Sequence, residues 1–430
     1  MSSSSPPPRR IHKRLPLPPP PQRSSLALWP DLDALDDDLA WAMFLLSRRM
    51  RAMADTPPPG LGRWARGLEV RAAAAGEVEI AADLRLLVRA SGVTEENRRP
   101  LAAACFRLAE WAQIRDVSEL AVQFASAAVA LDPTNPRRAY EAARLHRRCD
   151  RLGEAEILYG RAVWLARSAK RWGIFVRAHL GLGTIHQWRG EHEAGLAHFT
   201  TASNAAWSLS GEKWLAAITQ HELLGATTEA NQLDDALAHA RRANEWMPKH
   251  AENVPALVHD ASVMMVRMQA YGLAAPLLTV AVEKLSFAHF RAIASSTLAH
   301  AAAGVGSLHQ YLELRRNLLP IAASVPQHAG AIHANLAAGA HLLGLRTDAE
   351  WHAVRSIDVA TSRREFGIAA EARSTLDAVR RGAPPARARI DDPPIHLRTL
   401  AHDLETRLAV WRGPTWKRKR QSGAADLGEV

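Results

Sequence analysis

Small residues recur in this chain at one fixed spacing, and that spacing restricts the fold more than any other feature. In the segment LAVQFASAAVALDPTNP, Ala121, Ala125 and Ala128 stand at offsets 0, 4 and 7, and Pro133 follows at offset 12. Residues four and seven positions apart lie on one side of an α-helix. Small residues on that side let a second helix pack closely. The segment therefore predicts one half of a helical hairpin that ends at the proline.

The same spacing returns further along the chain at nearly regular intervals. Another helical segment of similar length, such as RAHLGLGTIHQW, precedes each set. Repeats of this kind are typical of helical hairpins stacked into a solenoid. The further sets are Ala155, Tyr159, Ala162; Gly195, Phe199, Ala202; Ala236, Ala240, Ala243 with Pro248; and two weaker sets, Ala274, Leu278, Ala281 and Ala349, Ala353, Ser356.

These residues resemble the tetratricopeptide repeat family, over about residues 101–380 and about seven repeats. The family's unit has about 34 residues. Several units here are longer, as the step from Ala162 to Ala202 shows. The resemblance implies an all-α fold, a right-handed α–α superhelix whose first helices line a concave groove for protein partners. One repeat is fitted by Leu182, Gly183, Gly190, Gly195, Phe199 and Ala202, and another by Leu108, Ala109, Ala121, Ala128 and Pro133.

The segments on either side of the repeats differ in composition. Residues 1–28 are rich in Pro, Ser and Arg, which favours an extended or disordered arm. An apolar stripe of Leu397, Leu400, Ala401, Leu404 and Leu408 predicts a helix that either caps the last open face of the solenoid, the favoured interpretation, or pairs with a partner. The predicted organisation is a disordered arm at 1–28, a helical leader at 29–95, the repeat domain at 96–381, a linker at 382–393, the capping or partner helix at 394–411 and a disordered basic tail at 412–430.

Positive charge is concentrated at the two ends. The formal net charge is +10, yet Arg9, Arg10, Lys13, Arg14 and Arg23 stand in an arm without acidic residues. Residues 376–430 add eleven Lys/Arg against seven Asp/Glu, which leaves the middle of the chain nearly neutral. The charge therefore gives only weak support for nucleic-acid binding, and places it in the tails.

Location and redox state follow from what the sequence lacks. PLPPPPPQ follows the basic N-terminal residues in place of an apolar run, so we expect no signal peptide. No stretch of about 18 uncharged apolar residues predicts a membrane span. Cys105 and Cys149 form neither CxxC nor a metal-type spacing and are interpreted as reduced, buried side chains. The predicted location is the cytoplasm.

The stretch WRGEHEAGLAHFTTA, at positions 188–202, is the strongest candidate for a reactive cluster, and it does not meet the geometric requirement. His192 and His198 are six positions apart and fall on different sides of a helix, whereas paired zinc ligands need a spacing of four. We expect both histidines to point to solvent or a neighbouring loop. Because no phosphate loop, nucleophile motif or metal spacing appears elsewhere, the sequence predicts no enzyme, no cofactor and no metal site.

A groove for a partner is predicted from the first helices of the units placed at 136 and 176. The resemblance assigns to the groove Leu180 and Thr184 and, as partner-binding residues, Arg137, Tyr140, Arg144, Arg147, Arg148, Arg177, Gln187 and Trp188. Arg137, Arg144 and Arg148 also share one face by periodicity alone. Guanidinium groups match carboxylates, so the predicted ligand is an acidic peptide or protein segment.

Four interpretations remain open from the sequence. The favoured one is a non-catalytic interaction scaffold. The alternatives are a sensor or regulatory module of a bacterial signalling or transcription system, and nucleic-acid contact through the basic tails. The fourth makes the arginines an ordinary solvated helix face with acidic neighbours.

Overall fold

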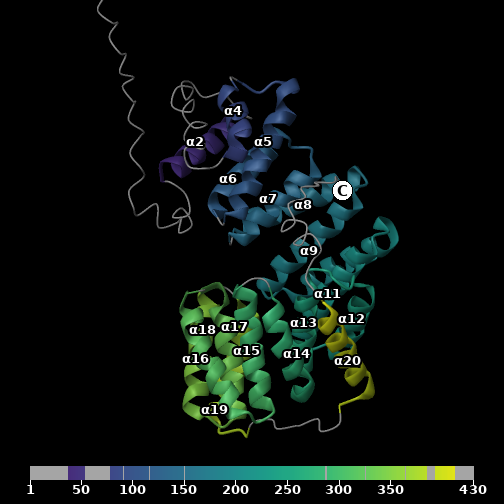
Figure 1. Ribbon diagram of the computed structural model, residues 1–430, viewed down its shortest axis with the longest axis vertical. Coiled ribbons are helices and arrows are strands. Elements are labelled where there is room, and N and C mark those ends of the chain that lie inside the picture. The colour runs from purple at the N-terminus through teal and green to yellow at the C-terminus, as the bar shows by residue number, and fades with distance from the viewer. Residues whose placement is uncertain are drawn as a thin grey trace, which may run out of the picture. The chain divides into compact units, whose positions relative to one another are not determined.

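The computed structural model describes residues 37–53, 78–90, 92–115, 117–149, 151–285, 288–324, 326–363, 365–384 and 393–411 (Figure 1). Within these ranges the regular structure is helical and contains no β-strand, so the predicted all-α fold is confirmed. The chain divides into two compact units, Met1–Ala169 and Lys170–Val430. This boundary falls inside the predicted repeat domain. The arm at 1–28, the tail at 412–430 and residues 385–392 of the linker lie outside the described residues.

Among its described residues, the first unit contains two helical hairpins and the helices that precede them. α5 packs against α6, α7 packs against α8, and α2 lies against α6. The sequence LDPTNP makes the turn between the hairpins, where Asn135 Oδ1 accepts hydrogen bonds from the backbone of Arg137 and Arg138 and Pro136 begins the next helix. The elements are α2 (Asp37–Met53), η3 (Val78–Ile80), α4 (Ala81–Arg89), α5 (Glu95–Ile114), α6 (Ser118–Leu131), α7 (Pro136–Arg148) and α8 (Leu152–Ser168).

The second unit continues the same arrangement with five hairpins among its described residues. Each odd-numbered helix from α9 to α17 pairs with the helix that follows it. The elements are α9 (Trp172–Trp188), α10 (His192–Ala205), η4 (Ala206–Ser210), α11 (Lys213–Glu229), α12 (Leu233–Trp246), α13 (Val254–Arg267), α14 (Tyr271–Lys284), α15 (Ala288–Gly304), α16 (Leu308–Ser324), α17 (Pro326–Leu342), α18 (Arg346–Ser362), α19 (Phe366–Arg380) and α20 (Ile395–Val410).

The residues that carry the repeat pattern form the packed interior of the hairpins. All of the residues at offsets 0, 4 and 7 are buried, in the weaker later sets as well as in the earlier ones. In the hairpin of α9 and α10, a Cβ atom built on Gly183 would lie 2.4 Å from Cε1 of Phe199. The glycine of one helix therefore makes room for the aromatic ring of the other, which explains this pair of residue types.

The turn between α9 and α10 shows how the chain reverses direction within a hairpin. Gly190 has a φ of +78°, a left-handed conformation that favours glycine. Its N–H bonds to the carbonyl of Gln187, and the N–H of Glu191 bonds to the carbonyl of His186. These contacts satisfy carbonyl groups at the end of α9 and let α10 begin at His192.

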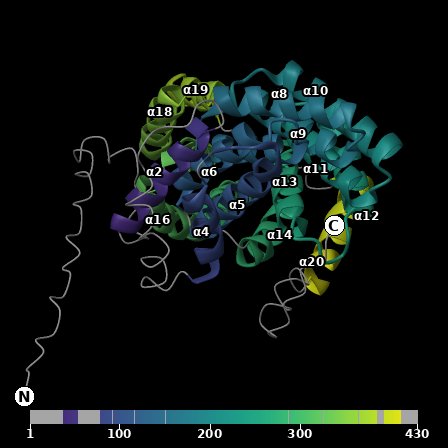
Figure 2. The same ribbon diagram turned by 90° about the horizontal axis from the view of Figure 1, so that it is seen from above.

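The helix predicted to cap the array, α20, occupies a different place. Its five apolar residues are buried as the stripe predicts, but they pack on α12, α13 and α14, in the middle of the second unit (Figure 1, Figure 2). The prediction that α20 covers the last open face is therefore wrong. The physical reason is that α12 and α14 together present an apolar surface that includes Leu237 and Leu277, and α20 completes its burial.

Candidate functional site

The arginines predicted from the sequence for the first unit lie on α7, and two of them are exposed. Arg137 and Arg148 face solvent, whereas Arg144 is half-buried. The Arg144 guanidinium donates to Oε2 of Glu141 at 2.8 Å and to Oε1 of Gln113 at 2.9 Å. The donors of Arg144 that would bind a ligand are thus partly engaged by the protein itself.

Carboxylates share this face of the first unit with the arginines. Burial raises the pKa of Glu110, Glu141 raises it further, and Arg137 and Arg144 lower it. Tyr140 packs its ring on Tyr159 at a centroid distance of 6.0 Å, and burial, partly offset by Arg147, raises the pKa of Tyr159 to about 12. The arginine face is therefore partly balanced by its own acidic neighbours.

The predicted groove residues of the second unit lie on α9, which begins at Trp172, before the predicted unit start at 176. Arg177 lies over the ring of Trp214 at 5.2 Å, and Gln187 Oε1 is 2.8 Å from Nδ1 of His192. Leu180 is buried and Thr184 bonds to its carbonyl oxygen, whereas Trp188 is 47% exposed. Of these positions, Trp188 offers the largest apolar surface to a ligand.

His198 does not point to solvent, so that prediction is wrong for this histidine. Its Nδ1 lies 2.9 Å from Nδ1 of His179 on the paired helix, and its ring stacks on His186 at 5.2 Å. Burial, with a smaller contribution from the nearby His198, lowers the pKa of His179 to about 4. The histidine thus serves the packing of α9 on α10.

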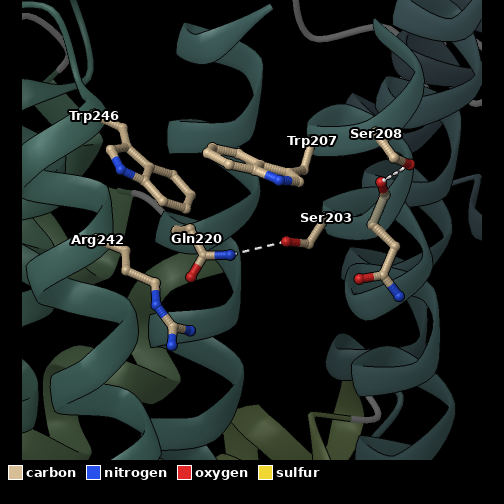
Figure 3. Close-up of a pocket in the computed structure, with 7 residues that line it drawn as sticks. Ser203, Trp207, Ser208, Gln220, Arg242 and Trp246 are labelled. Carbon is tan, nitrogen blue, oxygen red and sulfur yellow. Dashed lines mark hydrogen bonds between the residues drawn. The ribbon is translucent and has the colours of Figure 1, made fainter. Parts of the chain in front are cut away.

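A pocket of about 430 Å³ opens in the second unit between the end of α10, η4, α11 and α12 (Figure 3). Its size falls within the range of about 300–1,000 Å³ usual for ligand sites. Two tryptophans, polar side chains and one arginine surround it, a set that sequence reasoning missed. The lining residues are Ser203, Asn204, Trp207, Ser208, Gln220, Arg242 and Trp246; we call this the tryptophan pocket.

One wall of the tryptophan pocket depends on a short π-helix. The stretch Ala206–Ser210 widens the last turn of α10 and is followed by Gly211, whose φ is +65°. The wider turn displays Trp207, which is 65% exposed. Its ring stacks on Trp246 of α12 with centroids 4.9 Å apart and planes 23° apart. Such π-turns are often found at functional sites, because they reposition a side chain that a regular helix would place elsewhere.

A chain of hydrogen bonds holds the polar residues of the pocket. Gln220 donates its side-chain N–H to Ser203 Oγ at 2.8 Å (Figure 3). Its Oε1 lies 2.8 Å from Nδ1 of His239. Gln220 is 5% exposed, so its amide has a fixed orientation. Burial, with a further contribution from Arg242, lowers the pKa of His239. His239 is therefore neutral near pH 7 and donates its Nδ1–H to the glutamine.

Arg242 gives the tryptophan pocket its charge. Its side chain is exposed and lies beside Gln220 and Trp246 (Figure 3). Among the described residues it forms no ion pair, and none of the residues that line the pocket is acidic. The pocket thus combines an available guanidinium fork with aromatic faces and fixed polar groups, an arrangement suited to a carboxylate-bearing ligand.

One signal in the sequence could have located this pocket. Trp207 follows Ala202 by five positions and Trp246 follows Ala243 by three, so each stands just after the small-residue face of a second helix. Two tryptophans near the ends of successive second helices indicate neighbouring side chains. The π-turn that exposes Trp207, in contrast, has no recognisable pattern in the sequence.

Two kinds of feature are absent from the described part of the chain. None of its His, Cys, Asp and Glu residues form a group of three or more that could hold a metal ion. None of its helices combines the length and hydropathy needed to cross a membrane.

The stacked hairpins and the lateral pocket define an all-α, tetratricopeptide-like helical-repeat protein. No family model and no curated protein sequence matches the chain. Among solved structures, the apo form of RapI is 14% identical and matches 62% of this chain and 98% of its own, with a TM-score of 0.51. A Rap protein complexed with Competence and Sporulation Factor is 13% identical and matches 81% and 99% of the two chains, with a TM-score of 0.33. At such identity the likeness concerns the fold alone.

Proposed function

We propose that this protein is a non-catalytic interaction scaffold that binds an acidic peptide or protein segment at the tryptophan pocket. The observation that carries the proposal is the exposed Arg242, which forms no ion pair among the described residues, beside two stacked tryptophans in a pocket whose lining has no acidic residue. As part of this proposal we retain two predictions from the sequence, that the protein uses no cofactor and that it lies in the cytoplasm. It also assigns the repeats to the tetratricopeptide family, on the strength of their residue pattern.

The two parts of the pocket recognise two parts of such a segment. Trp207 offers an exposed ring on which an aromatic or aliphatic side chain of the ligand packs. Arg242 binds a neighbouring Asp or Glu side chain through two parallel hydrogen bonds. Gln220 and Ser203, already joined to each other, line the space between them.

The arginine face on α7 is the second place for an acidic segment within this proposal. Arg137 and Arg148 are its exposed members, and Glu110 and Glu141 reduce its net charge. We therefore assign it the smaller share of the affinity. If the double variant Arg144→Glu, Arg148→Glu binds an acidic peptide as well as the original protein does, this face takes no part.

A fluorescence titration with defined peptides tests the proposed function. The full chain is titrated with dye-labelled, end-blocked octapeptides that carry one Phe and either three Asp or three Lys. The proposal predicts preference for the acidic peptide, a loss of about tenfold in affinity for Arg242→Gln, and little change for Arg241→Gln, the exposed neighbour on α12. Equal binding of both peptides, or equal losses in both variants, would contradict it.

A further inference from the structure

We propose that Arg407 of α20 is a positioning residue for the tryptophan pocket, so that docking of α20 and ligand binding at the pocket support each other. The effect on ligand affinity rests on the proposed function. The effect on the position of Trp246 does not, because it concerns the protein without ligand.

Arg407 binds the end of the helix that carries one pocket wall. Its Nη1 donates to the carbonyl oxygen of Met247 at 2.7 Å, and its Nη2 donates to the carbonyl oxygen of Asn244. These two residues lie on either side of Trp246. The last carbonyl groups of a helix lack partners within the helix, and they carry the negative end of its dipole. A guanidinium group placed there satisfies them and fixes the last turn.

The surroundings of this contact place the guanidinium at a defined position. Leu404 and Leu408 of α20 are buried in the same apolar cluster as Leu237 and Met247 of the α12 region. One residue after α20, Trp411 Nε1 donates to the carbonyl oxygen of Ala251 at 2.9 Å. The segment that follows Trp246 is thus held at two points, by Arg407 of α20 and by Trp411 just after it.

One turn of α12 connects the Arg407 contact with the pocket and would transmit a displacement of the helix end to it. Arg242 and Trp246 are four positions apart and both line the pocket, so they move together when the end of α12 moves. The opposite wall is tied to α10, because Trp207 belongs to η4 and Gln220 is bonded to Ser203 on α10. Its bond to α12 is at His239, nearly two turns before Trp246 and away from the end that Arg407 holds. Loss of the Arg407 bonds would therefore shift one wall relative to the other.

Arg407 is half-buried, which indicates that the contact is specific. Desolvation lowers the pKa of its guanidinium, and Asp403 one turn earlier partly offsets this effect. A cation loses hydration when it is buried, and here the carbonyl oxygens of Asn244 and Met247 replace the lost water. A methionine at this position makes neither bond, and a lysine has one nitrogen to reach the two carbonyl oxygens that the guanidinium meets with two.

Circular dichroism reports the stacking of Trp246 on Trp207, because stacked indole rings give a coupled signal near 225 nm. The signal of the pair is obtained, for the full chain and for each variant, as the difference from the same chain carrying Trp207→Phe. We expect Arg407→Met to remove at least half of this signal, whereas Arg316→Met, an exposed arginine on α16, leaves it unchanged. An unchanged signal in Arg407→Met would overturn the inference, whether or not α20 stays docked.

A second variant keeps the test decisive if Arg407→Met does not fold. Arg407→Lys retains the charge and donates from a single nitrogen, so an intermediate signal is expected, and a full signal would contradict the inference. The acidic octapeptide is then titrated into the same variants. A reduced signal with no peptide binding in any variant would disprove the proposed function and leave the positioning role intact.

Discussion

Nδ1 of His179 lies 2.9 Å from Nδ1 of His198, across the hairpin of α9 and α10. Two imidazoles at this distance share one hydrogen bond, so one ring donates and the other accepts. The same sequence register recurs in two further hairpins. Those pairs are His333 with His352, with Nδ1 atoms 2.9 Å apart, and Gln220 with His239, whose Oε1 and Nδ1 are 2.8 Å apart.

Acid should weaken the fold through these histidine pairs. Burial lowers the pKa of His179 and of His333 to about 4, and that of His352 to about 3, from an ordinary value of 6.5. Because the unfolded chain takes up protons first, the free energy of unfolding falls as the pH drops from about 6.5 to about 4. After a discount for solvent screening, we expect a loss of about 1–3 kcal/mol per pair, measured by urea denaturation at successive pH values.

The Gln220–His239 pair, in the hairpin of α11 and α12, is the model for a control variant that tests this pH dependence. His179→Gln reproduces the Gln220–His239 pair at the same register, and keeps a hydrogen bond across the hairpin. This variant should unfold with the original free energy at pH 7.5 and lose less of it at pH 5. A pH profile that parallels that of the original chain would show that the His179–His198 pair does not contribute.

Gly183 should tolerate no side chain, because Phe199 fills the space beside it. A Cβ atom there would come within 2.8 Å of three ring atoms. We expect Gly183→Ala to lower the free energy of unfolding by about 1–3 kcal/mol. Gly225, inside α11, has no atom within 4 Å of a built Cβ atom, so Gly225→Ala should stabilise the protein by about 0.5–1 kcal/mol. Equal effects in thermal denaturation would exclude the proposed packing role.

The docking of α20 should be measurable as stability. Leu404 is fully buried against α12–α14, and Leu404→Ala should lower the free energy of unfolding by about 2–5 kcal/mol. Ile395, on the same helix, is 67% exposed, and Ile395→Ala should change stability by less than about 0.5 kcal/mol. If both substitutions are neutral in chemical denaturation, α20 does not belong to the folded core.

Most of the fold was predictable because it depends on local periodicity. The offsets of Ala121, Tyr159, Phe199 and their equivalents record which helix face is buried, and burial of one face determines each hairpin. The place of α20 was not predictable in this way. Its stripe of leucines shows that one face is buried, whereas the partner surface is formed by α12 and α14, which lie far away in the sequence.

The candidate site was predictable only in its chemistry. The sequence indicated arginine and tryptophan as ligand-binding residue types but placed them on the first helices, at Arg144 and Trp188. The structure gives Arg144 intramolecular partners and brings Trp207 of η4 together with Arg242 and Trp246 of α12. Such a combination depends on tertiary contacts and on a π-turn, neither of which has a simple sequence pattern.

The central claim is that an acidic segment binds at the tryptophan pocket, and fluorine NMR tests it most directly. The chain is labelled with 5-fluorotryptophan, each resonance is assigned with Trp→Phe variants, and the acidic octapeptide is added. The account predicts that the resonances of Trp207 and Trp246 shift in a saturable way while that of Trp188 does not. A shift of Trp188 with no change at Trp207 and Trp246 would contradict it and return the ligand to the groove predicted from the sequence.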